Sequence, residues 1–461
     1  MLRALQRHVG THLGFHVPLV RQATPLGLQR FNYVSARRLK STVPQVGRVD
    51  LTDTKSMVHV RGRDAAKLLN GLFTLPVSGG AATPFSGVFG AFLNGKGRVI
   101  TDAFLYTTSN HTEEDQSFVI EFDRSVEDEL LLHLKRHKIR AKVQIEKLTG
   151  YECVFIWNRD ATPDYWRSDN ECDSGFFQSL CEVAWSVAEV GESSESSEDQ
   201  KPLYGLLVDD RYPLLGIRMI LPAKTSSTYF SAIPSANLTQ YNMLRYIRGT
   251  PEGSREIPPN KALPMESDLD YMNGLDFNRG CYVGQELTIR THHTGVVRKR
   301  IVPFQLYQEG QEPGEYECAY DPELSEALPP LLDGSNVMSL NSPPEERTFA
   351  KSPFDAKPEA ADEGGVPSWA KPKEESAPSS PKPVKLGNIL SHHGNVGMAL
   401  VRLDKIMGQQ DIQLAVELPP GPNGEVNYLR AKLYYPLFVS DVSEAEAEAE
   451  VEQAIDKNGQ L

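Results

Sequence analysis

Residues 341–385 carry nine prolines in 45 positions, mixed with Lys, Glu, Ser and Ala. Proline fixes φ and removes a backbone donor, so this density excludes both a long helix and a central strand. We therefore expect a long solvated linker, inserted into a compact fold or extending it. The structured parts of the chain must lie before and after it.

Two other segments have the same character. Residues 186–202 are rich in Ser and Glu, and the acidic stretch 443–450 lies in a tail that we place at 441–461. Chains of low hydrophobicity and high charge cannot bury enough apolar surface to fold. We expect 186–202 and 341–385 to be disordered insertions, and the tail to be solvated.

The first forty residues contain seven Arg or Lys and no Asp or Glu, and the first acidic residue is Asp50. Scattered Leu, Val and Phe accompany these basic residues. This pattern is typical of a mitochondrial presequence, here residues 1–40, and predicts import into mitochondria. A secretory signal is excluded because Pro18 and Arg21 interrupt the apolar stretch. A disordered basic tail is the alternative.

The remainder of the chain is acidic, with 41 basic residues against 61 acidic ones. This balance argues against broad nucleic-acid binding, which needs a basic face. The sequence contains no run of about 18 apolar residues, so we expect no membrane-spanning helix. Five scattered cysteines without a CxxC pair exclude a disulfide-dense scaffold and a zinc ribbon.

Strand and helix signals alternate before the Pro-rich linker, and strand signals dominate from Val296 onward. Asn94-Gly95 lies between two apolar runs, which predicts a β-hairpin. The pattern predicts an α+β region followed by an all-β region. We expect strands at 51–62, 87–93, 98–106, 142–148, 296–306, 394–403 and 427–438, and helices at 65–70 with Asp64 as N-cap, at 125–137 with Ser125 as N-cap, and at 238–247.

The densest cluster of reactive groups surrounds one cysteine. It consists of Arg279, Gly280, Cys281, Tyr282, Gly284, Gln285 and Glu286. Glycines allow close backbone approach to a ligand, and a nearby guanidinium favours a thiolate, which is a nucleophile or a soft-metal ligand. The alternative is a small buried cysteine. One cysteine cannot hold an iron–sulfur cluster alone, so other ligands would have to come from elsewhere or from another chain.

Asp102 follows the predicted hairpin turn on an otherwise apolar strand. A carboxylate there is costly unless it is hydrogen-bonded or faces a cavity. An acid facing a cavity could bind the donor edge of a pterin. The alternative is a strand-end Asp that faces water.

Two histidine pairs, His292-His293 and His392-His393, are possible imidazole ligands. We place both pairs on strands, where adjacent side chains point to opposite faces, so at most one of each pair faces a given site. Surface or hydrogen-bonded histidines are the commoner outcome.

The motif "RGCYVGQE" (279–286) resembles the KGCYxGQE signature of the folate-binding, T-protein-like family often called YgfZ. The mitochondrial branch of that family comprises iron–sulfur cluster assembly factors. Further segments resemble the family in the same order, so the similarity covers most of the structured chain. These are "VRGRDAAKLLNGLFT" (60–74), "LNGKGRVITDAFLY" (93–106), "LRYIRGTPEGSREI" (244–257), "LTIRTHHTGVVRKR" (287–300) and "NVGMALVRLD" (395–404).

The resemblance implies a fold like that of the glycine-cleavage aminomethyltransferase. Two intertwined α+β modules would form a ring around a folate-sized pocket, and a β-barrel would follow at the C-terminal end. We place the folate-binding region at 45–290 and the barrel at 291–440, which the Pro-rich linker would interrupt.

The resemblance also implies a function: maturation of [4Fe–4S] proteins, such as aconitase and radical-SAM enzymes including lipoate synthase. A-type iron–sulfur scaffold proteins and apo client enzymes would be the partners. The cofactor would be tetrahydrofolate, and an iron–sulfur cluster would be shared transiently. Carried over by position, Cys281 supplies the thiolate. The residues expected to bind the folate or shape its site are Asp102, Arg279, Tyr282, Gly284, Gln285, Glu286 and Arg290.

A basic stripe could meet the glutamate tail of a folate, or it could simply be a solvated strand face. The stripe consists of Arg290, Arg298, Lys299 and Arg300.

Three positions depart from the family pattern. Arg279 stands where Lys is usual, and Asn94 replaces an Asp in the hairpin. The aminomethyltransferase has an Asp-Asp pair where this chain has Thr101-Asp102, which leaves the acid–base arrangement incomplete. We therefore expect a protein that is not a classical enzyme. Two alternatives are a folate-dependent aminomethyl or methyl transferase that uses Asp102, and a structural adaptor with a vestigial pocket.

Overall fold

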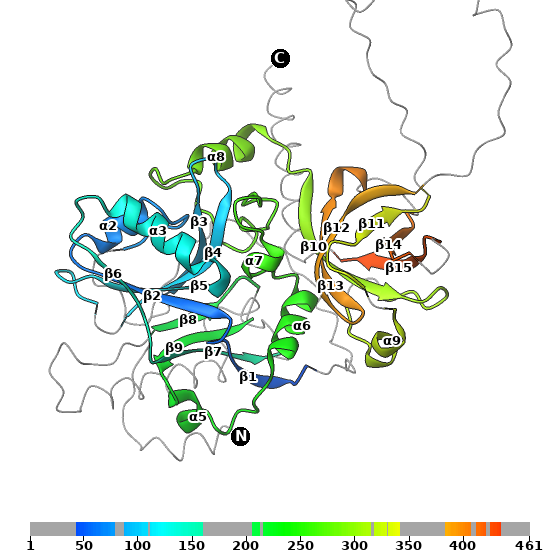
Figure 1. Ribbon diagram of the computed structural model, residues 1–461, viewed down its shortest axis with the longest axis horizontal. Coiled ribbons are helices and arrows are strands. Elements are labelled where there is room, and N and C mark those ends of the chain that lie inside the picture. The colour runs from blue at the N-terminus through cyan, green and yellow to red at the C-terminus, as the bar shows by residue number, and fades with distance from the viewer. Residues whose placement is uncertain are drawn as a thin grey trace, which may run out of the picture.

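A computed structural model describes ten stretches of the chain. They are residues 43–78, 87–108, 111–159, 205–212, 215–314, 318–329, 331–341, 383–406, 412–420 and 425–434. The predicted presequence, the Ser/Glu-rich insertion, the acidic tail and all but the edges of the Pro-rich linker lie outside them. Figure 1 shows two α+β modules beside a β-barrel, which matches the expected α+β region followed by an all-β region.

The first module is a five-stranded antiparallel sheet with the order β3-β4-β5-β2-β6. The predicted hairpin is confirmed, because β3 and β4 pair along their length around the Asn94-Gly95 turn. Helices α2 and α3 bury Leu68, Leu69, Leu130 and Leu134 in the core of this module. The elements are β2 (Lys55–Arg61), α2 (Ala65–Asn70), β3 (Gly87–Leu93), β4 (Val99–Thr107), β5 (Ser117–Asp123), α3 (Glu127–Lys138) and β6 (Gln144–Lys147).

The second module is a four-stranded sheet with the order β1-β7-β9-β8. Its edge strand β1 precedes the whole first module in the chain, and the other three strands follow it, so the two modules are intertwined as expected. Helix α6 begins at an Asn237 capping box and ends at Gly249, which has a positive φ. The elements are β1 (Val46–Asp50), β7 (Tyr151–Asn158), β8 (Gly205–Asp209), β9 (Gly216–Pro222), α5 (Thr225–Tyr229), α6 (Leu238–Arg248) and α7 (Gly253–Glu256).

The C-terminal part is a closed six-stranded barrel with the order β10-β13-β12-β11-β14-β15. The Pro-rich linker joins β11 to β12, which pair directly, so the linker interrupts the barrel as expected. The helix α8 (Gln285–Thr294) precedes the barrel. The remaining elements are β10 (Lys299–Tyr307), α9 (Pro322–Ala327), β11 (Asn336–Ser339), β12 (Val384–His393), β13 (Val396–Arg402), β14 (Leu414–Glu417) and β15 (Tyr428–Leu433).

Three local predictions were wrong in detail. The cap before α3 is Asp123, whose carboxylate accepts from the Ser125 N–H, and a 3₁₀ turn precedes the helix. Asp64 occupies the N-cap position of α2, but its carboxylate accepts from Lys142 N instead of capping the helix. His292 and His293 lie in α8, because the chain stays helical up to residue 294.

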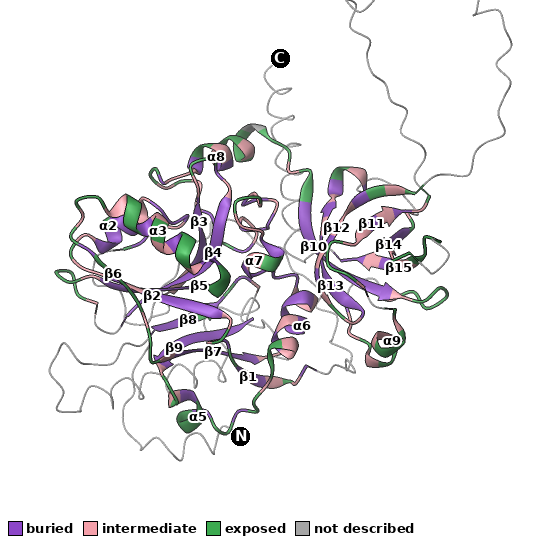
Figure 2. Cartoon of the chain, viewed as in Figure 1, coloured by how far each residue is buried: buried purple, intermediate pink, exposed green. Residues whose placement is uncertain are grey.

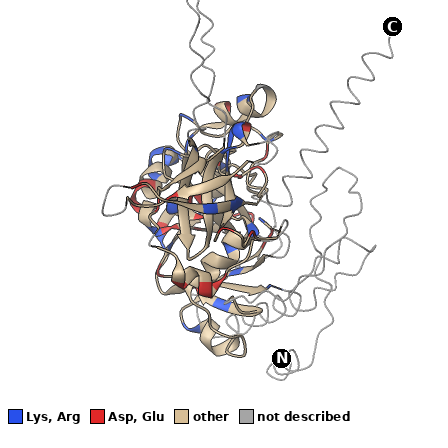
Figure 3. Ribbon diagram, turned by 90° about the vertical axis from the view of Figure 1, so that its right-hand side faces the viewer, with Lys and Arg blue, Asp and Glu red and all other residues tan. Residues whose placement is uncertain are grey.

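Strand β4 is the most deeply buried element, since all nine of its residues are buried. Figure 2 shows this strand and its neighbours at the centre of the α+β part, with exposed positions on the outer helices. On the barrel side, basic and acidic positions are interspersed (Figure 3). Among the described residues, none of the helices combines the length and hydrophobicity that a membrane span requires.

Candidate functional site

The thiol of Cys281 lies on the surface, in the loop that leads into α8. Its two flanks differ, because Gly280 is exposed whereas Tyr282 is buried in the core. The Gln285 side chain closes the loop by accepting from Tyr282 N at 3.0 Å, and Val283 N donates to Gly71 O at 2.9 Å. The alternative of a buried cysteine is therefore wrong, and the exposed thiol is carried by a firmly anchored loop.

The guanidinium of Arg279 anchors the same loop to the end of α2. It donates to Phe73 O at 2.7 Å and to Asn70 O, and it lies 5.0 Å from the ring centre of Tyr282. Burial raises the pKa of the Tyr282 phenol to about 12, so this residue is a neutral packing group at physiological pH. Arg279 and Tyr282 thus hold the loop that presents Cys281.

Gly284 brings the cysteine loop against the β3–β4 hairpin. Its φ is +84°, and a Cβ there would lie 2.4 Å from Asn94 O. Gly97 is the reciprocal partner, because a Cβ on it would lie 2.9 Å from Gly284 O. Gly280 meets nothing within 4 Å and has no positive φ, so the close approach at this loop is made by the hairpin backbone at Gly284.

The predicted basic stripe does not form. Arg290 lies exposed on α8, and Arg298 and Lys299 are exposed near the start of β10. Arg300 is buried instead, and its guanidinium binds both carboxylate oxygens of Asp270 at 2.8 Å. Neither alternative proposed for the stripe holds for Arg300, because this side chain points into the fold.

The histidine pairs make local contacts. The His292 ring stacks on Phe277 at 3.8 Å between ring centres, which packs the cysteine loop against α8. His392 bonds to Leu331 O at 3.1 Å. Glu286 is exposed at the start of α8. Within the described stretches, no group of three or more His, Cys, Asp or Glu side chains has the geometry of a metal site.

Asp102 lies in the interior of the α+β part and is 2% exposed. Both of its carboxylate oxygens accept from Gly253 N at 3.1 Å, so the alternative of an aspartate facing water is wrong. Burial raises the pKa of Asp102 to about 6, against the opposing effect of Lys55. Thr101 does not replace the missing carboxylate, since its hydroxyl donates to the Asp102 carbonyl.

Around Asp102 lies a cluster of six buried ionic side chains, which we call the ionic network. Arg218 is its centre, with bonds to Glu121 at 2.5 Å, Glu252 at 2.5 Å and Asp209 at 3.1 Å. Arg211 binds Asp209 and Glu252, each at 2.8 Å. The members are Lys55, Glu121, Asp209, Arg211, Arg218 and Glu252.

One donor of the network is unused. Arg211 is 1% exposed, and its Nη1 has no hydrogen-bond partner among the described residues. Its guanidinium lies over the rings of Phe89 and Phe104, at 5.0 and 4.7 Å from their centres. Arg211 therefore carries a buried donor beside Asp102.

Sequence reasoning missed the ionic network, although a signal was present. Glu121 lies in the run SFVIEFD and Arg218 in the run GIRMILP, which are otherwise almost wholly apolar strands. A charge in such a strand needs a buried partner, by the argument that singled out Asp102. The sequence does not reveal that Arg218 pairs with Glu121, because the two residues lie on strands of different sheets.

The cysteine loop and Asp102 lie at different places along the β3–β4 hairpin. Gly97, which touches the loop, lies in the turn before β4, whereas Asp102 is the fourth residue of β4, and the three strand steps from Val99 to Asp102 alone span roughly 10 Å. The structure therefore groups the predicted residues into two sets. One surrounds the surface thiol and the other surrounds the buried carboxylate.

The chain is similar to known proteins along nearly its whole length. The chain is 85% identical over 455 residues to the "Iron-sulfur cluster assembly factor IBA57 homolog, mitochondrial" of Yarrowia lipolytica, covering 94% of this chain and 95% of that protein. It is 32% identical over 453 residues to the protein of the same name from Neurospora crassa, covering 93% and 90% of the two chains. No family model matches.

The fold is similar to a solved structure, the glycine cleavage system aminomethyltransferase T from Bartonella henselae. The TM-score is 0.51 at 11% identity, and the match covers 86% of this chain and 87% of that chain. At this identity the likeness concerns the fold alone, which is the T-protein-like fold expected from the sequence.

Proposed function

Since the chain belongs to the family of mitochondrial iron–sulfur cluster assembly factors named IBA57 homologs, we propose that it matures [4Fe–4S] proteins in the matrix through the thiol of Cys281. The observation that carries the proposal is the exposure of this thiol on a loop that buried Tyr282 and the hydrogen bonds of Arg279 and Gln285 anchor. An anchored loop presents a ligand at little cost in conformational entropy.

The iron–sulfur cluster is the cargo in this proposal. Clusters are normally held by four ligands, and Cys281 supplies one, so the other thiolates come from a partner. A-type iron–sulfur scaffold proteins are the proposed partners. Apo enzymes such as aconitase and lipoate synthase are the proposed recipients. The exposed position of Cys281 suits a ligand shared between two chains.

Tetrahydrofolate is the proposed cofactor, held beside the ionic network. Two features of the chain suit it: the carboxylate of Asp102, whose oxygens keep lone pairs beyond the Gly253 bond, and the unused Nη1 donor of Arg211. When bound, the folate supplies a one-carbon carrier. The role of Arg290 toward its glutamate tail and the role of Glu286 in shaping the site stay predictions. Calorimetry with tetrahydrofolate on wild-type protein and Asp102→Asn tests this part, and equal affinity in both would contradict it.

A folate-dependent one-carbon transferase is the second candidate. It is favoured by the pKa of about 6 at Asp102, which suits proton transfer near neutral pH. It is weakened by Thr101, whose hydroxyl is committed to a backbone carbonyl. Turnover of a methylated or aminomethylated donor by the wild-type protein, lost in Asp102→Asn, would favour this candidate over the first.

The decisive test of the first candidate is complementation in cells that lack the protein. We expect Cys281→Ser to fail to restore matrix aconitase activity and protein lipoylation, although the variant accumulates to the wild-type level. Serine keeps the size of the side chain but loses the thiolate.

Asn278→Ala is the matched control, because Asn278 is an exposed side chain in the same loop. It should restore both readouts. Full activity of both readouts with Cys281→Ser would show that the thiol has no part in the function.

A further inference from the structure

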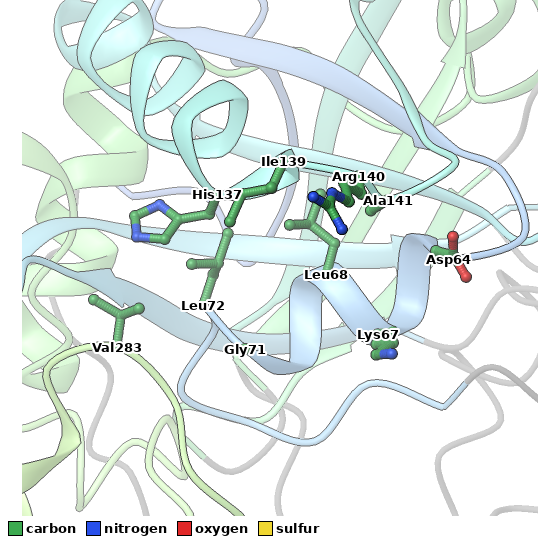
Figure 4. Close-up of a pocket in the computed structure, with 10 residues that line it drawn as sticks. All are labelled: Asp64, Lys67, Leu68, Gly71, Leu72, His137, Ile139, Arg140, Ala141 and Val283. Carbon is green, nitrogen blue, oxygen red and sulfur yellow. The ribbon is translucent and has the colours of Figure 1, made fainter.

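A groove of about 500 Å³ opens between α2 and the end of α3. Figure 4 shows Leu68 and Leu72 at its floor, with Ile139 and Arg140 reaching over them. Asp64 lies at one end and Val283 at the other. The groove therefore has an apolar interior and charged groups at its rim.

Ile139 lies at this groove in an arrangement that is unfavourable in two ways: its apolar side chain is exposed, and its backbone is strained. It is 83% exposed, and its φ is +42°, a region that β-branched residues rarely adopt. Leu132, one of the other large exposed apolar residues, lies seven positions earlier, on α3. Backbone strain persists where surrounding structure enforces it, and such outliers concentrate at functional sites. Exposed apolar groups beside a groove mark surfaces that bind other molecules.

The rim is strongly basic in a chain whose net charge is −13. No acidic residue occurs between Glu129 and Glu146. None of the rim cations forms an ion pair within the described part of the chain. The rim cations are Lys67 and Arg140, which line the groove, together with Lys135, Arg136, Lys138 and Lys142, each of which lies within two residues of a lining residue in the chain.

Helix electrostatics explains only part of this charge. Cations in the last turn of a helix offset its dipole, which accounts for the basic residues up to Lys138. Arg140 and Lys142 lie beyond the helix, and Lys67 lies on α2. The remaining positive charge calls for an anionic partner.

The groove is connected to the cysteine loop. Val283 lines one end of it and lies two residues after Cys281, and its backbone N–H donates to Gly71 O at 2.9 Å. A molecule seated in the groove is thereby held beside the exposed thiol.

We propose that this groove, with Ile139 and the basic rim, is the docking surface for an acidic protein partner that inserts an apolar side chain next to the Cys281 loop. The proposal rests on the proposed function, in which a partner shares ligands with Cys281. A concave apolar interior fits a protruding side chain better than a flat bilayer.

The test measures the affinity of the full chain for a purified A-type scaffold protein by calorimetry. We expect Ile139→Gly to weaken binding at least tenfold while leaving the melting temperature unchanged or higher, since glycine tolerates the positive φ. The double variant Lys67→Glu/Arg140→Glu should also weaken binding at least tenfold. The affinity of this variant should also depend less on salt concentration than the wild-type affinity does.

Lys385→Glu is the matched control, an exposed charge reversal on the barrel strand β12, and it should bind as wild type does. Cys281→Ser should still bind, which separates docking from the proposed thiol chemistry. Three results would each overturn the proposal: no binding by the wild-type chain, equal binding by the groove variants, or loss only of binding to anionic lipid vesicles. A tail deletion (441–461) that raises affinity in wild type but not in the charge-reversal variant would assign the groove to the chain's own acidic tail instead.

Discussion

At the scale of the residue, Asp102 shows how its surroundings set the state of a buried acid. The ionic network has three cations, Lys55, Arg211 and Arg218, and three carboxylates. An ionised Asp102 adds a fourth carboxylate, so the charges balance only when it is protonated. Burial is the main cause of its raised pKa, and the carboxylate of Glu252 adds to the rise. The resulting value of about 6 leaves the side chain ionised at the pH of the matrix, at a cost in stability.

Asp102→Asn should therefore stabilise the protein at neutral pH. The pKa of Asp102 rises from 3.8 to about 6 on folding, so its ionisation costs stability progressively as pH increases from about 4 to about 6. The full cost, on the order of 3 kcal/mol, is present above pH 6. Denaturant unfolding of both proteins at pH 4.5 and 7.5 measures it. If Asp102→Asn raises the free energy of unfolding by no more at pH 7.5 than at pH 4.5, the raised pKa of Asp102 is contradicted.

At the scale of the element, the cysteine loop, the β3–β4 hairpin and the end of α2 form one packed unit. Gly284 meets the hairpin at Asn94, and Val283 and Arg279 bind the backbone at the end of α2. Three segments that resemble the family separately in the sequence therefore meet in space. Their shared task is to fix the loop that presents the thiol.

Gly284→Ala should separate this structural role from a ligand-binding one. The added Cβ meets Asn94 O at 2.4 Å and the φ of +84° disfavours any side chain, so we expect a loss of roughly 1–3 kcal/mol in unfolding free energy. Gly280→Ala, four residues earlier with open space around it, should change stability by less than about 0.5 kcal/mol. Urea unfolding compares the two, and equal losses would show that the hairpin contact does not matter.

At the scale of the whole molecule, the ionic network joins the two α+β modules. Arg218 lies on β9 of the four-stranded sheet, and Glu121 lies on β5 of the five-stranded sheet. Glu252 lies just before α7 and binds Arg218, Arg211 and Lys55. Removal of one partner leaves the remaining charges buried and unpaired. This costs much more free energy of unfolding than the intact pair contributes to stability.

Arg218→Met should accordingly destabilise the protein by about 3–5 kcal/mol, because it leaves three buried carboxylates short of a cation. The matched control is Arg430→Met, which removes the partner of Glu309, a carboxylate that is mostly exposed. We expect that change to cost less than about 1 kcal/mol. Chemical denaturation gives both values, and a similar small loss in both variants would mean that the network does not hold the modules together.

Much of the architecture follows from local signals. The Asn94-Gly95 turn between apolar runs predicts the hairpin, and both this hairpin and the helix expected at 238–247 are present. Where two local signals compete or a signal is weak, the sequence predicts the wrong cap or the wrong kind of element. Asp123 and Ser125 are both residue types that favour the N-cap position, and Asp123, which is closer to β5, takes that position. The helix at His292-His293 lacks a clear apolar periodicity, so its sequence does not distinguish it from a strand.

The sequence by itself determined the class of the fold and the order of its segments, and it singled out Cys281 as the candidate thiol, because each of these depends on residues close together in the chain. Tertiary structure alone decided that Cys281 is exposed, that Asp102 is buried on Gly253, and that Arg218 meets Glu121. These contacts join residues 151 and 97 positions apart. Such pairings are set by the way two intertwined sheets pack, and the energy of a buried charge depends on neighbours that only that packing supplies.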